Sequence, residues 1–580
     1  MAEVRVAQEI RPPEPPPEAS QLGFVVWLRK NLFNSVLNSV LTVISAVALF
    51  FGAKGGLGFL LADDRLWRVI PPNATNYAVE SFPRDSLGRI WFSVGIVAVL
   101  AGLSTAFWRP SGMTSWGKIV AALRGIGAAA LVLGFLTPST FGPRNLIMIL
   151  GVVLIVATAV ALRTLGERAK EETVPTLATL AAMLLLLLSI IWALPVASST
   201  KVPWTVMVTV GVVAYLAGRL LVRLTSAQFL KTAVVGSWIL SLPVIYLTVQ
   251  RDPVIPWDRV AQWLPVVALI TALGVGAIYL VTRLDRERAA IVNAILVIAS
   301  VGVWFVSMPM LFRFLTLGAT VVSLAAPTFA ASGKGARNFS IGWVGMALFI
   351  TYFVTMSVSS SGLESRAEII GGMNLTFLLA LGGMLLSFPL GIMLALGRTS
   401  TMPVFRLMST GYIEVVRGVP LITVLFFADV VIPRFLPPGL DFEGMVKAII
   451  AIALFAAAYL AENIRGGLQS IAGGQREAAK ALGMTTGQMT MLITLPQALK
   501  AVIPALVGQV ISLFKDTSLV AIIGLADFFR VARDIVPNQP ASLGSVIENL
   551  VLAAVVYWVF TFSFSRASLR LERRLGVGTR

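Results

Sequence analysis

The sequence predicts an all-α polytopic membrane protein, and three observations lead to this fold class. Hydrophobic residues make up 57% of the 580 residues and charged residues only 13%, where soluble domains contain about 25% charged residues. The mean hydropathy is +0.86. Long runs without any charged residue follow one another along the chain. A chain this apolar cannot hide its hydrophobic surface in soluble cores of ordinary size, so it needs a membrane.

The N-terminal segment 1–23 differs from everything that follows it. It contains five prolines among Glu and Arg, and it has no long apolar stretch of the kind that secretion requires. This composition is typical of an extended, disordered segment. We therefore expect a cytoplasmic tail.

After this tail, eight runs carry no charge and are each about long enough for a helix to cross ~30 Å of hydrocarbon. Backbone polar groups in lipid must bond internally, so runs this long favour helices over barrel strands. The eight runs are Asn31–Ala53, Trp91–Trp108, Asn145–Leu162, Val174–Thr200, Val260–Thr282, Ala289–Phe312, Phe314–Gly333 and Ile369–Gly397. Less uniform runs lie near 119–136, 203–218, 232–249, 338–358, 419–436, 446–461, 498–525 and 548–565. Together they predict roughly 16 transmembrane helices.

The distribution of basic residues predicts the orientation. Lys and Arg number 46 against 28 Asp and Glu, a net charge of +18. With the N-terminus inside, the inner loops hold about twice as many Lys and Arg as the outer ones, as the positive-inside rule requires. The Arg-rich stretch from Arg566 to Arg580 independently favours a cytoplasmic C-terminus. We expect a multi-pass protein with both termini in the cytoplasm.

Composition also excludes several kinds of chemistry. The chain has no Cys and no His, which removes disulfides, thiolate nucleophiles, typical zinc sites and His-based acid–base catalysis. The segment Gly112–Ile119 comes close to a phosphate-binding P-loop, but Ile119 stands where a Mg²⁺-binding hydroxyl is needed. We interpret it as a basic loop at the membrane interface. A nucleotide that drives this protein must therefore be bound by another chain.

The stretch 462–500 is the most informative part of the sequence, because it is too long and too polar for a simple turn between spans. Gln475–Leu482 is rich in helix formers, and Gly483 can take the left-handed conformation that ends a helix. Thr485 and Gln488 fit a capping box that begins a second helix, and Pro496 is expected to end it. Two short helices joined by a tight turn are predicted. An interfacial elbow without a partner is equally compatible with these residues.

A resemblance to a known family decides between these two interpretations. Glu477-Ala478-Ala479, Gly483 and Ile493-x-Leu495-Pro496 resemble, at matching spacing, the EAA loop of permease subunits of ABC importers. The surrounding motifs resemble permeases for polar amino acids, and an N-terminal one resembles the general L-amino acid permease branch. These motifs are Glu414–Leu421, Tyr459–Glu462, Leu513–Leu519 and Trp27–Phe33. The resemblance is dense over 365–570, loose over 24–108 and absent over 111–335.

The resemblance implies a type I ABC importer permease core near the C-terminus, in a bacterial inner membrane. It implies a cytoplasmic ATP-binding subunit, which holds ATP and Mg²⁺, so that this chain binds no cofactor. It also implies a second permease subunit, related or identical, and an extracytoplasmic amino-acid-binding protein. Glu477 and Ala478 would contact the ATPase and Gly483 would make the turn, with Ala479, Ile493, Leu495 and Pro496 completing the coupling loop.

Five segments follow from these observations. They are a disordered tail (1–23), N-terminal membrane helices (24–110), additional helices of unknown role (111–365), the permease domain (366–570) and a basic cytoplasmic tail (571–580).

Ionisable residues inside spans are costly and are candidates for function. Asp429 lies near the predicted midplane, and Lys515 and Asp516, adjacent and therefore on different helix faces, lie within another span. With Thr517 and Ser518 they are candidates for a substrate pathway, since an amino acid carries an ammonium and a carboxylate. The alternative is that Asp429 and Lys515 only tie helices together.

Four further charged positions lie at the edges of spans. Glu414 and Arg417, an i, i+3 pair, form either a cytoplasmic gate or an interfacial salt bridge. Arg124 and Arg313 are expected to extend to the membrane interface.

The leading hypothesis is a permease subunit of an ATP-driven, binding-protein-dependent importer of polar L-amino acids. The alternative is an ion-coupled secondary transporter or a channel without an ATPase, for which a coupling loop has no use. A membrane enzyme is disfavoured by the missing His and Cys and by the lack of a carboxylate cluster. We therefore expect no catalytic residue, no metal site and no nucleic-acid partner, while membrane lipid surrounds the chain.

Overall fold

The computed structural model describes residues 24–62, 64–80, 82–108, 113–136, 144–165, 173–193, 198–254, 257–329, 333–357, 364–367, 370–436 and 442–575. The predicted tail 1–23 and residues 576–580 of the predicted tail 571–580 lie outside these ranges, while residues 571–575 form the end of the last helix. The chain divides into two compact units, with the boundary after Trp67.

The first unit contains two helices, α1 (Phe24–Asn31) and α2 (Val36–Leu61). The side chain of Ser35 caps α2 by accepting a hydrogen bond from the backbone N–H of Asn38 at 3.1 Å. Arg65 lies over the ring of Phe59, 4.3 Å from its centroid.

The second unit begins with short helical turns and α3 (Ala74–Val79), and three groups of apolar helices precede its C-terminal core. The first group packs around Phe107 and Tyr215 and consists of α4 (Leu87–Trp108), α9 (Ser198–Leu224) and α10 (Ala227–Gln250). The second consists of α5 (Trp116–Leu136), α6 (Arg144–Leu165) and α8 (Thr176–Ala193). Within the second group, the Nε atom of Arg124 donates to Thr158 at 3.4 Å.

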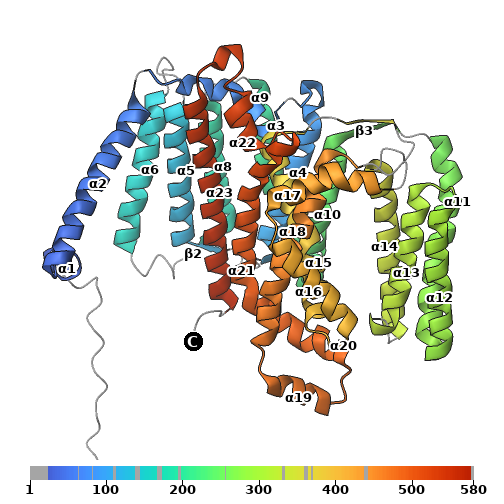
Figure 1. Ribbon diagram of the computed structural model, residues 1–580. Coiled ribbons are helices and arrows are strands. Elements are labelled where there is room, and N and C mark those ends of the chain that lie inside the picture. Colours follow the sequence, from blue (N-terminus) through green and yellow to red (C-terminus); the bar gives the residue numbers. More distant parts are fainter. Residues whose placement is uncertain are drawn as a thin grey trace, which may run out of the picture. The chain divides into compact units, whose positions relative to one another are not determined.

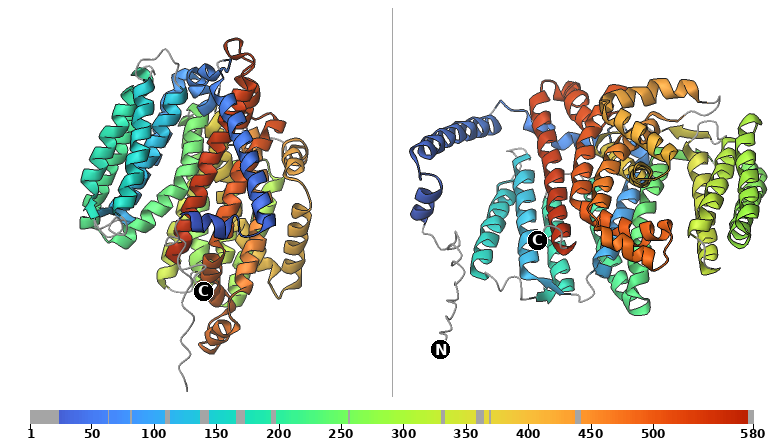
Figure 2. Two further views of the ribbon diagram at one scale, coloured as in Figure 1. Left: turned by 90° about the vertical axis from the view of Figure 1, so that its left-hand side faces the viewer. Right: turned by 60° about the horizontal axis from the view of Figure 1, so that its bottom comes forward.

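The third group surrounds the almost fully buried Trp343, whose indole N–H donates to the backbone oxygen of Thr271 at 2.9 Å. It consists of α11 (Trp257–Arg283), α12 (Arg286–Gly302), α13 (Met310–Phe329) and α14 (Gly333–Ser357). These four helices stand together as one bundle (Figures 1 and 2). Gly274 and Gly318 leave the room that the Trp343 ring fills, since a Cβ on either would lie within about 3 Å of it.

Two short antiparallel strand pairs interrupt the helical architecture. One joins β1 (Met113–Ser115) to β2 (Thr173–Pro175), and the other joins β3 (Arg251–Val254) to β4 (Glu364–Ala367). The segment that comes close to a P-loop thus contains β1 and runs directly into α5. The sequence did not predict these strands. β1, β3 and β4 fall in loops between apolar runs, whereas β2 lies at the start of the run Val174–Thr200, where the sequence predicts a helix.

The C-terminal core is built on α18, many of whose residues are fully buried. Its elements are α15 (Gly372–Arg398), α16 (Pro403–Arg417), α17 (Leu421–Phe426), α18 (Gly444–Gln469), α19 (Gly473–Ala481), α20 (Thr486–Met489), α21 (Leu495–Asp516), α22 (Phe528–Arg530) and α23 (Val546–Leu575). Helix α3, from the start of the second unit, and its N-cap residue Asn73 also contact this core. Asn73 donates to the Ser542 hydroxyl at 3.2 Å, and Tyr77 of α3 donates to Asn549.

The all-α membrane fold is confirmed, but the count of sixteen spans is not. Within the described ranges, ten helices are long and apolar enough to cross a membrane, or eleven if the bent pair Pro403–Arg417 and Leu421–Phe435 counts as one. That pair is bent by 108°, so the predicted run 419–436 is not a simple straight span. Other predicted runs contain shorter apolar helices: Ile119–Leu131, Asn145–Ala161 and Phe339–Tyr352.

Candidate functional site

A compact helical unit, residues 473–494, connects α18 to α21 and projects beyond the ends of the neighbouring helices (Figure 1). Its first helix, α19, ends in a Schellman motif. The N–H of Gly483 donates to the oxygen of Lys480 at 2.9 Å, and that of Met484 donates to Ala479 at 3.1 Å. Gly483 has a φ of +75°, a left-handed conformation that Gly adopts without a Cβ penalty. The predicted reversal at Gly483 is therefore confirmed.

The second helix of this unit begins with the predicted capping box. The backbone N–H of Gln488 donates to the Thr485 hydroxyl at 3.3 Å, and the N–H of Thr485 donates to the Gln488 side chain at 3.0 Å. The prediction that Pro496 ends this helix is wrong. A π-helical turn (Thr490–Thr494) follows α20, and Pro496 lies in the first turn of α21. Proline is tolerated there because the first N–H groups of a helix have no intrahelical acceptor.

The two faces of this unit differ sharply in exposure. Ala479 and Met489 are buried, while Glu477, Ala478 and Leu482 are exposed, Leu482 to 80%. The Gln497 amide donates to the Gln475 side-chain oxygen at 2.6 Å and joins the unit to the start of α21. The unit therefore presents charged and apolar side chains, with Arg476, Glu477 and Lys480 exposed beside Leu482, on a support joined to α21. Of the other residues predicted for this loop, Leu495 is buried, Ile493 is half-buried and Pro496 is exposed.

A cluster of ion pairs lies where α18 approaches this unit, with Glu462 at its centre. The Glu462 carboxylate contacts Arg398 of α15 at 2.6 Å, Arg465 at 2.9 Å and Arg417 of α16 at 3.7 Å. Arg398 also contacts Glu414 at 2.8 Å. We call these five residues the Glu462 cluster. Because its members come from α15, α16 and α18, the cluster joins three helices of the core.

The predicted pair of Glu414 with Arg417 does not form. Glu414 pairs with Arg398 and Arg417 pairs with Glu462, because both partners lie on neighbouring helices within reach. Arg417 also lies over the ring of Tyr459, 5.4 Å from its centroid. The guanidinium of Arg417 thereby bridges the Glu462 cluster and the cavity described next.

A cavity of about 440 Å³ lies between α17, α18 and α21. Its walls mix apolar groups with polar ones, the polar members being Tyr459, Asn463, Gln509, Ser512 and Asp516. The Asn463 amide donates to the Gln509 oxygen at 3.1 Å, and the Gln509 amide donates to the backbone oxygen of Ala456 at 2.9 Å. Ser512 donates to the Asp516 carboxylate at 3.4 Å. Its size and its few fixed polar groups are those of a small-molecule site.

The structure separates the residues predicted for a substrate pathway. Asp516 lines the cavity, whereas the adjacent Lys515 is exposed and does not line it. The hydroxyls of Thr517 and Ser518 donate to the backbone oxygens of Phe514 and Lys515 at 2.9 and 2.8 Å.

Asp429 does not line the cavity either. It lies in a π-helical turn, Phe427–Val431, and its carboxylate contacts Lys447 of α18 at 3.8 Å. This is the geometry of a contact that ties two helices together.

At the opposite end of α21, Asp527 is fully buried. Its two carboxylate oxygens accept hydrogen bonds from the backbone N–H groups of Phe529 and Arg530 at 3.0 and 3.1 Å, and Tyr557 donates to it at 3.4 Å. Burial raises the pKa of Asp527 to about 6, although the backbone N–H groups oppose this shift. Thr376 accepts from the N–H of Phe528 at 3.1 Å, so this corner joins α15, α22 and α23.

Sequence reasoning missed several of these residues. Arg398, Asn463, Gln509 and Ser512 were not singled out, because the contacts that make them noteworthy cross between helices. Glu462 and Arg465 stand at i, i+3 on one helix and could have been found as a local pair. Over the part of the chain that the structure describes, no group of three or more acidic residues gathers to hold a metal ion.

Comparison with known proteins matches this core. Residues 387–577 match the family described as binding-protein-dependent transport system inner membrane component. The chain is 48% identical over 208 residues, 36% of its length, to the inner membrane amino-acid ABC transporter permease protein YhdY of Escherichia coli, of which the match covers 56%. It is 46% identical over 37% of its length to the glutamate/glutamine/aspartate/asparagine transport system permease protein BztC of Rhodobacter capsulatus, with 49% of BztC covered.

A shorter relative is covered almost completely. The chain is 37% identical over 220 residues to the glutamate/aspartate import permease protein GltK of Escherichia coli, of which the match covers 96%. The chain thus spans about half the length of the first two relatives, and the matches cover only 36% and 37% of its own length.

Proposed function

We propose that this chain, which belongs to the family of binding-protein-dependent transport system inner membrane components, is the permease subunit of an ATP-driven importer of polar L-amino acids. Its C-terminal helices would form a type I importer core. The observation that carries this proposal is the helical unit 473–494, which presents Glu477 and Ala478 exposed on α19 and connects α18 to α21, the two helices that supply most of the polar cavity's lining. A transporter that works without a partner ATPase has no need of such a unit.

The coupling step follows from the rigidity of this unit. The Schellman motif at Gly483 and the capping box at Thr485 hold the two helices at a fixed angle, and Gln497 ties them to α21. A movement imposed on Glu477 by a cytoplasmic ATPase would therefore be transmitted to α21 and α18, whose residues line the cavity. ATP and Mg²⁺ belong to that ATPase subunit in this proposal.

The cavity provides the route for the substrate. Asp516 offers a carboxylate for the ammonium group of an amino acid, and Arg417, stacked on the lining residue Tyr459, brings a guanidinium beside the cavity for the carboxylate. The names of the three relatives, which refer to amino acids and in two cases to glutamate and aspartate, support a polar amino acid as substrate. The substrate would arrive from an extracytoplasmic binding protein, and a second permease subunit would complete the path.

In this proposal the Glu462 cluster closes the cytoplasmic end of the path. Its ion pairs join α15, α16 and α18 in the arrangement described here, so opening that end requires at least some of them to separate. We propose both termini to be cytoplasmic, as the distribution of Lys and Arg favours.

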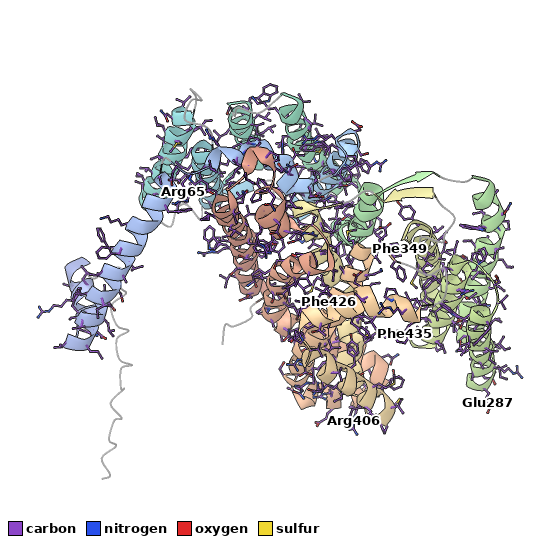
Figure 3. The ribbon with its side chains drawn as sticks, turned by 45° about the horizontal axis from the view of Figure 1, so that its top comes forward. Arg65, Glu287, Phe349, Arg406, Phe426 and Phe435 are labelled. Atoms are coloured by element: carbon purple, nitrogen blue, oxygen red, sulfur yellow. The ribbon has the colours of Figure 1, made fainter. Side chains whose placement is uncertain are left out.

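The experiment that tests this function uses the full chain co-expressed with its ATPase and second permease subunit in proteoliposomes. Uptake of radiolabelled polar amino acids should require internal ATP and the external binding protein. Glu477→Lys should abolish uptake, and it should also abolish the stimulation of ATP hydrolysis by the substrate-loaded binding protein. Glu287→Lys, the same charge reversal at an exposed position in the first turn of α12 (Figure 3), is the matched control and should leave both unchanged. Uptake driven by an ion gradient without ATP would overturn the proposal.

A further inference from the structure

A second cavity, of about 350 Å³, lies between the bundle α11–α14 and the C-terminal core, and its walls are of a different kind. Four lining residues come from α13 and four from α14, while Phe442 precedes α18 and Ile450 lies in its second turn. All ten are apolar. A cavity without polar groups does not retain water, since a water molecule needs two to four polar partners.

The cavity opens toward the perimeter of the protein. Leu317 and Val321 of α13 are 42% and 55% exposed, and Met346 and Phe349 of α14 are 41% and 38% exposed. Phe349 is labelled in Figure 3 on α14. For a helix bundle embedded in a membrane, the medium on that perimeter is the acyl-chain region of the bilayer. The occupant available to an apolar cavity that opens there is an acyl chain.

The direction of the cavity follows from the helices that line it. Phe314 and Phe442 lie near the beginnings of α13 and α18, while Val321 and Ile450 lie farther along them. The cavity therefore extends inward from the membrane interface, over about 10 Å between Phe314 and Val321 at the helical rise.

A basic residue stands at the interfacial end of this cavity. Arg313 is the fourth residue of its span, about 5 Å from the end of the helix, where headgroups lie. Its guanidinium lies over the ring of Trp304 at 5.5 Å, and Trp304 packs edge-to-face against the lining residue Phe314, with centroids 6.1 Å apart.

The hydrogen bonds of Arg313 do not use all the N–H donors of its guanidinium. Nη2 donates to the backbone oxygen of Val306 at 2.9 Å, and Nη1 lies 3.9 Å from the sulfur of Met310. Nε is buried and has no hydrogen-bond partner among the described residues. An arginine carries five N–H donors, so a guanidinium fixed in this way still has donors for a phosphate.

We propose that this cavity binds one acyl chain of a phospholipid whose phosphate is held by Arg313. The bound chain fills the gap between α13 and α14 on one side and Phe442 and Ile450 of the core on the other. The extra helices absent from short relatives such as GltK would thus be joined to the core partly through a lipid. This site is independent of the amino-acid path, because none of its lining residues is shared with the polar cavity.

The test measures lipid binding by native mass spectrometry of the purified full chain, titrated with dioleoyl phosphatidylglycerol and, separately, with dioleoylglycerol, which lacks the phosphate. The wild-type protein should retain one phosphatidylglycerol. Leu317→Trp, which fills the cavity from a partly exposed position, should weaken this binding at least tenfold. Leu273→Trp, at a 59% exposed position of α11 that does not line the cavity, is the matched control and should bind as the wild type does.

The phosphate contact is tested by Arg313→Gln. This variant should bind phosphatidylglycerol about tenfold more weakly and leave the binding of dioleoylglycerol unchanged. Equal loss in Leu317→Trp and Leu273→Trp, or undiminished binding in Leu317→Trp, would overturn the proposal, and so would an unchanged phosphatidylglycerol affinity in Arg313→Gln.

A second measurement needs no variant. A phosphatidylglycerol with a photoreactive group in its acyl chain should cross-link to peptides of α13 and α14. Cross-links confined to other helices would contradict the proposed site.

Discussion

Glu462 of α18 and Arg398 of α15 form a 2.6 Å contact in which both side chains are mostly buried, at 16% and 21% exposure. Exposed ion pairs contribute little to stability, because water screens them and side-chain entropy opposes them. This pair differs, since the same carboxylate also faces Arg417 and Arg465. Removing its charge leaves three guanidinium groups without their main counter-ion.

The first prediction follows from the position of Glu462 among these three guanidinium groups. Glu462→Gln should lower the free energy of unfolding by about 1–3 kcal/mol, the range for leaving partly buried charged groups without their partner. Glu414→Gln removes only the more exposed contact with Arg398 and should cost less than about 1 kcal/mol. Thermal unfolding of the purified variants in one detergent measures both. A larger loss in Glu414→Gln would contradict the central position given to Glu462.

The second prediction concerns the turn of the helical unit 473–494. Gly483→Ala places a Cβ at a φ of +75° and should destabilise the turn by about 1–2 kcal/mol, although there is open space around it. Gly474→Ala also has open space, but Gly474 lies within α19 with ordinary helical geometry, so it should be neutral or stabilising.

Hydrogen exchange over residues 473–494 should therefore be faster in Gly483→Ala alone. Uptake per ATP hydrolysed should fall in the same variant. Faster exchange in Gly474→Ala as well would mean that side-chain bulk, and not backbone conformation, is responsible.

The contrast between Gly483 and Glu462 shows what the sequence could predict. The conformation of Gly483 and the capping box of Thr485 depend on residues within one turn of the chain, so local chemistry is enough to predict them. Arg398 and Glu462 are 64 residues apart, and their contact exists only because α15 packs against α18. A local rule also misplaced Pro496, because proline both ends helices and begins them.

The candidate substrate pathway also contains a part that the sequence could predict and a part that it could not. Helical geometry correctly indicated that Lys515 and Asp516 face different surroundings, and Asp516 indeed lines the cavity. The polar wall formed by Asn463, Gln509 and Ser512 was not predicted, since uncharged polar residues on an apolar helix give no distinct pattern. The bend between Pro403–Arg417 and Leu421–Phe435 is different, because it falls at a local signal: Gly418 caps the end of α16 and Pro420 precedes α17.

The third prediction is a dependence of stability on pH. The pKa of Asp527 is raised to about 6 in the folded protein, against about 3.9 in an unfolded chain. Between these values the folded state binds more protons than the unfolded one. Stability therefore falls as pH rises from about 4 to about 6, by about 3 kcal/mol at most, and does not fall further above that window.

Asp527→Asn removes this titration while it keeps the shape and a side-chain oxygen for the N–H groups of Phe529 and Arg530. Melting temperatures measured from pH 4.5 to 7 should fall more steeply in the wild type than in the variant. The difference between the two curves isolates Asp527 from the other carboxylates. Parallel curves would mean that the Asp527 carboxylate is not perturbed by its burial.

The fourth prediction separates a substrate contact from a contact that ties helices together. Asp516 lines the polar cavity, whereas Asp429 faces Lys447 at 3.8 Å outside it. Asp516→Asn should raise the KM for uptake about tenfold or more, as expected for the loss of one charged hydrogen bond, while assembly and basal ATP hydrolysis stay intact.

Asp429→Asn should mainly lower the melting temperature, because it leaves the ammonium of Lys447 without this counter-ion. The double variant Asp429→Asn/Lys447→Gln should recover part of that loss, since it removes both charges together. Uptake kinetics and thermal unfolding of the same preparations distinguish the two roles. A raised KM with unchanged stability in Asp429→Asn would instead assign Asp429 to the path, because only a residue that meets the substrate changes its affinity without weakening the fold.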